Sequence, residues 1–314
     1  MIKKLCSVLL LLVLVTSCST GNSSENDIDI KVLSPKGAPA LSMVTYAAQN
    51  EGLVDFVDGA DLLQAAFLNP TPEYQVIVAP VNLGGKLATL EKTEYKLAGI
   101  VTWGNLYFVA ANEDALTDGM VLAAFGEGSV PGLLLESLQD DLTLEIVYYN
   151  SVVDAQAALL SGKADVALLA EPAATATISK SITDESIDEL MIVGDVQAMV
   201  EEKLGGYGYP QAGIFVLESF YTKYPEMVDD FLIEVSESIN NPVYSDLFDA
   251  VEMLGADEVG VSESVFINQL SSEEVPPVFG RMNVYYKDAT DVKVELENFL
   301  NLFGIEISEQ IYLK

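Results

Sequence analysis

The stretch Val152–Ser181, VVDAQAALLSGKADVALLAEPAATATISKS, decides the fold class. Its first part, Val152–Leu160, reads as an amphipathic helix that stops at Ser161-Gly162. Ala164–Ala170 is apolar nearly throughout, as expected of a strand that is covered on both faces. A second helix is expected over Ala173–Ser181, directly after a proline. The order helix, buried strand, helix indicates an α/β protein.

The same alternation continues on both sides of this stretch. Strands are expected at Ile28–Leu33, Gln75–Ala79, Tyr95–Val101, Leu106–Ala111, Val121–Phe125, Leu144–Tyr149 and Ala212–Leu217. Helices are expected at Ala40–Gln49 and Ala60–Leu68, after the Pro80–Gly85 loop, after the Gly-rich turn that follows Phe125, and in about four segments from Ser219 onward. We therefore predict mixed, mostly parallel sheets with flanking helices.

The N-terminus carries an export signal. Lys3 and Lys4 precede the apolar run Val8–Val15, which has the length of a signal-peptide core and is too short to span a bilayer. The tetrapeptide that ends at Cys18 (VTSC) resembles a bacterial lipobox, in which the Cys thiol is acylated and becomes the new N-terminus. We predict a signal peptide over 1–17, lipidation at Cys18 and a flexible tether over 18–27. Two acyl chains suffice for stable anchoring, which indicates an extracytoplasmic protein held at a membrane.

Composition excludes several function classes. The formal net charge of −33 opposes binding to nucleic acid or anionic lipid. The sequence has no His, which removes Ser-His-Asp and Cys-His catalysis and the commonest neutral metal ligand. Of the two cysteines, Cys6 lies in the signal peptide and Cys18 is the lipidated residue. We therefore expect no catalytic residue, no metal and no cofactor, and we predict that the protein is not an enzyme.

The loops at the ends of the predicted strands carry the candidate binding residues. In open α/β sheets, ligands bind where the carboxyl ends of strands meet the amino ends of helices. The loops are Ser34–Pro39, Ala79–Gly85, Thr102–Asn105, Gly126–Gly132 and Ala170–Ala173. Side-chain oxygens there can orient a polar ligand, Trp103 can stack on a flat ring, and Glu171 can accept from an amine. Arg281 either reaches this cleft or makes an ordinary surface pair.

These loops resemble those of one known family. The chain is similar to bacterial ABC-transporter substrate-binding lipoproteins of the nitrate/sulfonate/taurine and thiamine-precursor class. The matching stretches are Ser34–Pro39 (SPKGAP), Ala79–Gly84 (APVNLG), Thr102–Tyr107 (TWGNLY), Ala124–Gly132 (AFGEGSVPG), Ala155–Ala174 (AQAALLSGKADVALLAEPAA) and Tyr209–Phe215 (YPQAGIF). Their order and spacing, together with the lipobox, carry the resemblance, and they cover essentially the whole mature chain.

The resemblance implies a type II periplasmic-binding-protein fold with a ligand cleft between two lobes. Lobe 1 would comprise 28–110 and 213–314 and lobe 2 would comprise 111–212, with crossings near Val109–Asn112 and Gly208–Ala212. One side of the cleft would supply Ser34, Lys36, Gly37, Pro80, Asn82, Trp103 and Asn105. The other side would supply Gly128, Ser129, Val130, Glu171 and Tyr207. By the same resemblance, the protein is a monomer that delivers its ligand to permease and ATPase subunits of an importer.

The ligand class stays open between two candidates. A flat heteroaromatic such as a hydroxymethylpyrimidine-type thiamine precursor fits the inventory of Trp103, Asn82, Asn105 and Glu171. A small anion such as a sulfonate, taurine or nitrate requires positive charge, which among these loops only Lys36 and the helix N-termini provide. We favour the heteroaromatic on this inventory. A sensing lipoprotein that uses the same cleft without transport is the alternative of another class.

Overall fold

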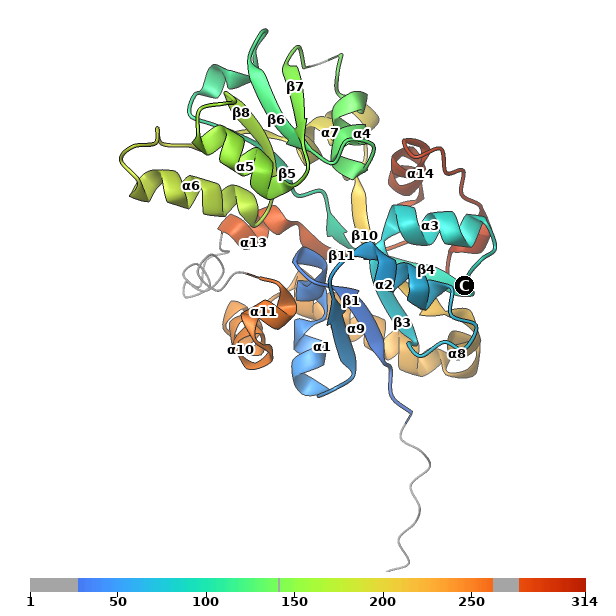
Figure 1. The fold of residues 1–314 in the computed structure, drawn as a ribbon. Coiled ribbons are helices and arrows are strands. Elements are labelled where there is room, and N and C mark those ends of the chain that lie inside the picture. The colour runs from blue at the N-terminus through green and yellow to red at the C-terminus, as the bar shows by residue number, and fades with distance from the viewer. Residues whose placement is uncertain (1–27, 141, 262–276) are drawn as a thin grey trace, which may run out of the picture.

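The computed structural model describes residues 28–140, 142–261 and 277–314. These residues form two β-sheets, each flanked by helices, and the chain passes twice between them (Figure 1). We call the six-stranded sheet with its helices lobe 1 and the five-stranded sheet with its helices lobe 2. Within the described residues, no helix has the length and apolar character needed to cross a membrane.

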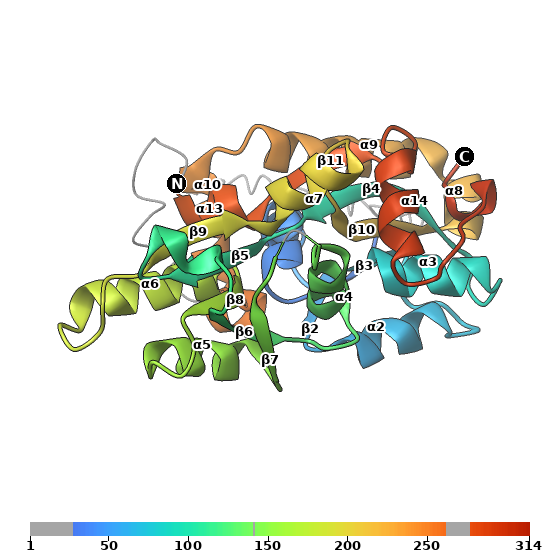
Figure 2. The same cartoon turned by 90° about the horizontal axis from the view of Figure 1, so that it is seen from above.

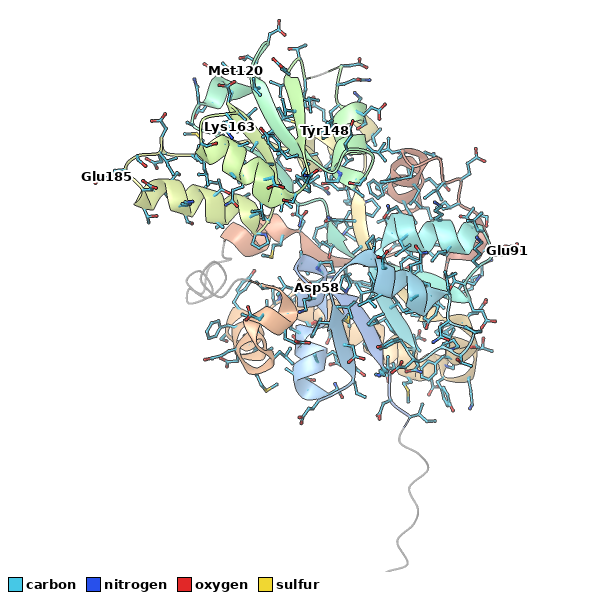
Figure 3. The ribbon with its side chains drawn as sticks, in the orientation of Figure 1. Asp58, Glu91, Met120, Tyr148, Lys163 and Glu185 are labelled. Atoms are coloured by element: carbon cyan, nitrogen blue, oxygen red, sulfur yellow. The ribbon has the colours of Figure 1, made fainter. Side chains whose placement is uncertain are left out.

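Lobe 1 is built on a mixed sheet in the order β11-β4-β10-β3-β1-β2. Its strands are β1 (Val32–Pro35), β2 (Val54–Val57), β3 (Val76–Pro80), β4 (Tyr95–Trp103), β10 (Pro210–Leu217) and β11 (Val284–Asp288). β1 pairs in parallel with β2 and β3, whereas β10 runs antiparallel to both β3 and β4. The carboxyl ends of the three parallel strands therefore meet at one edge. Asp58, which directly follows β2, lies at this edge, facing lobe 2 (Figure 3).

Lobe 2 is built on a sheet in the order β7-β6-β8-β5-β9. Its strands are β5 (Leu106–Ala110), β6 (Val121–Phe125), β7 (Glu145–Tyr149), β8 (Val166–Ala170) and β9 (Met191–Asp195). β6 is parallel to β7 and β8, and β5 is antiparallel to β8 and β9. The α/β class and the mixed sheets are confirmed. Among the described strands, parallel ladders occur within β1–β3 and within β6–β8, because the strands beside each crossing run the other way.

Helices cover the faces of both sheets. In lobe 1 they are η1 (Ala38–Ser42), α1 (Val44–Gln49), α2 (Ala60–Phe67), α3 (Val81–Thr89), α8 (Glu218–Lys223), α9 (Pro225–Asn240), α10 (Tyr244–Leu254), α11 (Ala256–Val259), α13 (Pro277–Met282), α14 (Lys293–Asn301) and η3 (Glu309–Ile311). In lobe 2 they are η2 (Glu113–Leu116), α4 (Val130–Ser137), α5 (Val152–Leu160), α6 (Ala173–Thr183) and α7 (Val196–Leu204). One apolar cluster contains residues of both lobes and passes through the crossings, from Phe215 through Trp103 and Leu106 to Leu134.

Five described elements are absent from the sequence prediction: β2, β9, β11, α7 and η2. The three strands are short edge strands of four or five residues with half-exposed side chains, so they lack the apolar runs that mark the buried strands. The predicted crossing at Val109–Asn112 is wrong. All of β5 pairs within lobe 2, and the chain crosses earlier, between Trp103 and Leu106.

Glu234 on α9 gives a pH-dependent prediction. Its Oε1 is buried without a hydrogen-bond partner, and burial raises the pKa of its carboxyl group. A raised pKa in the folded state means that the ionised carboxylate destabilises the fold, increasingly as the pH rises through that pKa. We expect Glu234→Gln to raise the free energy of unfolding at pH 7 and by less at pH 5. Urea denaturation at both pH values checks this. Glu237→Gln, at an exposed position of the same helix, should show no such difference.

Candidate ligand site between the lobes

The two crossings are tied to each other at the junction of the lobes. The first crossing is Gly104-Asn105, and the second runs from the end of α7 to Tyr209. The side-chain amide of Gln197 donates from Nε2 to Tyr207 O at 2.6 Å and accepts from Tyr209 N–H at 3.2 Å. Gly104 N–H in turn donates to Tyr209 O at 3.1 Å. This arrangement fixes the base of the space between the lobes.

A cavity of about 850 Å³ is lined by residues of both lobes. Lobe 1 contributes α2, the length of α3 and the segment after α14, and lobe 2 contributes the first turn of α4; Figure 2 shows these helices grouped together. The lining residues are Ala60, Gln64, Leu68, Pro80, Asn82, Leu83, Lys86, Leu87, Leu90, Lys92, Gly128, Ser129, Val130, Pro131, Leu133, Leu302, Phe303 and Ile305. This size suits a small organic molecule.

The lining of this cavity differs in charge from the rest of the protein. It contains Lys86 and Lys92, whereas none of the described residues that line it is Asp or Glu. Three cavities on lobe 2 each include an aspartate, among them Asp154, Asp165 and Asp184. In a chain with 48 acidic and 15 basic residues, a cavity without carboxylates that carries two ammonium groups favours a negatively charged ligand.

Helix α3 supplies one wall of the cavity through ordinary helical spacing. Asn82, Lys86 and Leu90 follow at intervals of four residues and therefore share a face. The sequence prediction placed a loop here because of Gly84-Gly85, but both glycines are buried within the helix. A Cβ at Gly84 would overlap the Phe215 ring. Gly84 therefore allows close packing of the helix on the sheet. The spacing of residues 82, 86 and 90 was the sequence signal for this wall.

Five of the predicted site residues line this cavity: Pro80, Asn82, Gly128, Ser129 and Val130. They come from both lobes, at the amino ends of α3 and α4. The Ser129 hydroxyl donates to Gly126 O at 2.8 Å and makes no capping hydrogen bond to α4. The cavity thus unites part of the predicted set with residues that the sequence analysis missed, chiefly the two lysines and the apolar segment Leu302–Ile305.

The structure places Trp103 and Ser34 in the protein interior. Trp103 is fully buried and stacks on Tyr285 with ring centroids 5.2 Å apart and nearly parallel planes. Its Nε1 donates to Tyr285 O at 3.2 Å. Ser34 is also fully buried, and its hydroxyl donates to Pro35 O at 3.2 Å. The prediction that Trp103 stacks on the ligand is not supported, because its ring faces are covered by protein.

Three other predicted residues also lie outside the lining of this cavity. Lys36 forms an ion pair with Asp58 at 3.4 Å and donates to Asp257 O at 3.2 Å, so its charge is engaged within lobe 1. Gly37 begins η1 with a positive φ of 88°, and its N–H donates to Val259 O. Tyr207 is 47% exposed, and its ring contacts Lys287 Nζ, 4.6 Å from the ring centroid.

Asn105 and Glu171 lie next to each other at the junction. Glu171 N–H donates to Asn105 O at 3.0 Å, and Asn105 Nδ2 donates to Glu171 O at 3.5 Å. Glu171 does not present a free carboxylate, because Arg281 and Thr175 occupy both of its oxygens. Asn105 Oδ1, Thr102 Oγ1 and Gln211 Oε1 are buried without a partner. Such groups are rare in native proteins, so the junction contains polar atoms that a bound ligand or water would satisfy.

The described residues offer no group of three or more Asp, Glu, Cys or His that could hold a metal ion.

No family model matches the sequence, and no curated protein matches it. Solved structures do match. An ABC transporter structure from Parabacteroides distasonis is 22% identical with a TM-score of 0.69, over 92% of this chain and 99% of that one. The periplasmic aliphatic sulphonate binding protein SsuA from Escherichia coli is 15% identical with a TM-score of 0.60, over 88% and 86%. A Candida albicans protein described as having the generic periplasmic binding protein fold is 13% identical with a TM-score of 0.52, over 90% and 93%.

The chain has the periplasmic-binding-protein fold. Residues of both lobes line the cavity described above. A ligand in such a cavity contacts both lobes at once, so it stabilises the arrangement in which they are close together. The geometry is thus suited to reversible capture of a small molecule.

Proposed function

We propose that this protein is the solute-binding component of an ABC importer. The observation that carries the proposal is the cavity of about 850 Å³ with walls from both lobes and two lysines without a lining carboxylate. The similarity to an ABC transporter structure and to a sulphonate binding protein supports it. The protein would act as a monomer, capture its ligand by closure of the lobes, and pass it to permease and ATPase subunits. Capture of this kind requires no catalytic chemistry.

We further propose that the protein works at the extracytoplasmic face of a membrane, anchored by lipid on Cys18. Residues 1–27, including the signal peptide, Cys18 and the tether, lie outside the described part of the chain. The lipobox resemblance supports the anchor, which would keep the binding lobes near a membrane partner and raise their effective concentration there. Metabolic labelling with an alkyne fatty acid tests this: the full chain should be labelled, and Cys18→Ala should not.

For the ligand, we propose an organic anion with an apolar body, such as an alkanesulfonate. Lys86 and Lys92 would attract the anionic end, and Leu83, Leu87 and Phe303 would contact the apolar part. A hydroxymethylpyrimidine-type thiamine precursor is the second candidate. It is less favoured because Trp103 is buried and the Glu171 carboxylate is paired with Arg281, and these are two of the groups on which that candidate rested.

Isothermal titration of the full chain with alkanesulfonates of two to eight carbons, nitrate and hydroxymethylpyrimidine tests the ligand class. Each CH₂ that enters an apolar site contributes about 0.8 kcal/mol, or about fourfold in affinity. We expect the affinity to rise with chain length until the cavity is filled, and nitrate to bind poorly. Binding of hydroxymethylpyrimidine without binding of any sulfonate would contradict the proposed ligand class.

The two lysines give a matched test of the charge argument. Exposed charge interactions are worth about 0.2–1 kcal/mol each, so Lys86→Gln or Lys92→Gln should weaken sulfonate binding by up to about fivefold. The effect should shrink as salt is added, because the lysines are exposed. Lys180→Gln, which removes a lysine from a cavity on lobe 2, is the control and should leave sulfonate affinity unchanged.

A further inference from the structure

Arg281 is the single arginine of the sequence, and it lies at the boundary between the lobes. It belongs to α13, which directly precedes β11 of lobe 1 and lies beside α6 of lobe 2 (Figure 1). Arg281 Nε donates to Glu171 Oε1 at 2.5 Å, and Arg281 Nη2 donates to Thr175 Oγ1 at 2.5 Å. Because Glu171 and Thr175 follow β8 of lobe 2, both bonds join one lobe to the other.

The carboxylate in this pair is completely buried. The Glu171 side chain is 0% exposed, whereas the Arg281 side chain is 28% exposed. Glu171 Oε2 accepts from Thr175 N–H at 3.1 Å, and Oε1 accepts from the Thr175 hydroxyl at 2.8 Å. A buried carboxylate that loses its cation is strongly destabilised, whereas replacing both charges by apolar groups is often tolerated. Separation of the lobes therefore requires either loss of this ion pair or hydration of Glu171.

Hydrogen bonds to lobe 2 and to the first crossing also hold the chain segment that carries Arg281. The Tyr107 hydroxyl, from β5 of lobe 2, donates to Arg281 O at 2.8 Å. Burial raises the pKa of Tyr107, so this hydroxyl keeps its proton at neutral pH. Asn283 Nδ2 donates to Gly104 O at the first crossing. The segment Arg281–Asn283 therefore contacts both lobe 2 and the crossing, which gives the guanidinium a defined position.

Other ion pairs of the described residues have a different placement. Lys31 pairs with Asp55 and Glu73, Lys36 with Asp58, Lys96 with Glu218, and Lys293 with Glu309. Each of these pairs lies within lobe 1, and each carboxylate is at least 45% exposed. Exposed pairs of this kind contribute little to stability. The Arg281–Glu171 pair differs from them in both respects: its carboxylate is buried and it spans the lobes.

We propose that the Arg281–Glu171 pair is a ligand-independent contact that favours closure of the lobes and so sets the affinity of the inter-lobe cavity. Glu171 and Thr175 act as positioning residues for Arg281 and do not touch the ligand. The part of the proposal that concerns closure stands on the structure alone, and the part that concerns affinity rests on the proposed function. Apparent affinity scales with the fraction of molecules in the binding-competent state, so a contact that stabilises closure raises it.

Small-angle X-ray scattering of the full chain without ligand tests closure directly. We expect Arg281→Leu and Glu171→Leu each to increase the radius of gyration. Arg281→Leu leaves the Glu171 carboxylate without its cation, and Glu171→Leu leaves the Arg281 guanidinium without its carboxylate. The expected shift of the open-to-closed ratio in Arg281→Leu is about a hundredfold. The double variant should increase the radius of gyration by less than the sum of the two single variants. Lys293→Leu, which breaks an ion pair within lobe 1, is the control and should scatter like the native chain.

The proposal is overturned if the radius of gyration is unchanged in both single variants, or if the changes are strictly additive in the double variant, whatever happens to the melting temperature.

If Arg281→Leu does not fold, the radius of gyration of Thr175→Val is measured in its place. This substitution removes the hydroxyl that bonds Glu171 and Arg281 while keeping the side-chain shape, and an unchanged radius of gyration in that variant also overturns the proposal. Affinity is then measured with hexanesulfonate and should fall by the factor by which the closed population falls. Absence of hexanesulfonate binding contradicts the proposed ligand and leaves the scattering result on closure intact.

Discussion

Trp103→Ala should lower the free energy of unfolding by about 3–5 kcal/mol, the usual range for removing a large buried aromatic side chain. Trp103 is fully buried at the end of β4, stacked on Tyr285 and bonded through Nε1 to Tyr285 O. Its loss leaves a cavity at the point where the apolar cluster passes from one lobe to the other. Urea denaturation followed by far-UV circular dichroism measures the effect without relying on tryptophan fluorescence.

Tyr207→Ala is the matched control for this result. Tyr207 contacts the edge of the Trp103 ring at a centroid distance of 6.3 Å but is 47% exposed. Truncation at such a site removes little buried area and should cost less than about 1 kcal/mol. A stable Trp103→Ala variant that has lost ligand binding would contradict the structural role and return Trp103 to the binding site.

Gly208→Ala should be the most damaging small change at the second crossing. Gly208 has a φ of +85°, which costs a residue with a Cβ about 1–2 kcal/mol. A Cβ there would also overlap the Gln197 side-chain amide, which bonds Tyr207 O and Tyr209 N–H. Forcing atoms into a packed site adds about 1–3 kcal/mol, so the total loss should reach about 2–5 kcal/mol, with the same urea assay as the measure.

Gly119→Ala separates the two contributions. Gly119 also has a positive φ, +82°, but a Cβ there would meet no atom within 4 Å. Gly119→Ala should therefore lower the free energy of unfolding only by the cost of the positive φ. Equal losses at Gly119 and Gly208 would mean that the Gln197 contact does not hold the crossing in place.

The central elements of the fold were predictable because their burial leaves a clear pattern in the sequence. α5 was expected at Val152–Leu160 and has these same bounds, and β8 and β10 lie within or close to their expected ranges. Edge strands such as β2 and β9 were not predicted, since they are short and only half-buried. Which of the two sheets contains β5 could not be predicted either, because an apolar run shows that a strand is buried but not which strands pair with it.

The candidate site shows a similar division. The loops at the ends of strands include Pro80, Asn82 and Ser129, which line the inter-lobe cavity, and their role in binding stays a prediction. Residue type alone misassigned Trp103, because an aromatic ring suits a binding wall and a core equally well, and only its neighbours distinguish the two. Lys86 was missed because the glycines before it suggested a loop rather than a helix.

The amino-acid sequence alone was enough to predict the α/β class and the strongest buried elements, because these depend on local periodicity. It also shows that the chain has no His and has cysteine only at positions 6 and 18. It also supplied the export and lipidation hypothesis. The tertiary structure decided which candidate side chains are buried, which face the cavity, and that Glu171 pairs with Arg281, 110 positions further along the chain. The physical reason is that a side chain's role depends on the groups around it, and those groups come from distant segments that only the folded chain brings together.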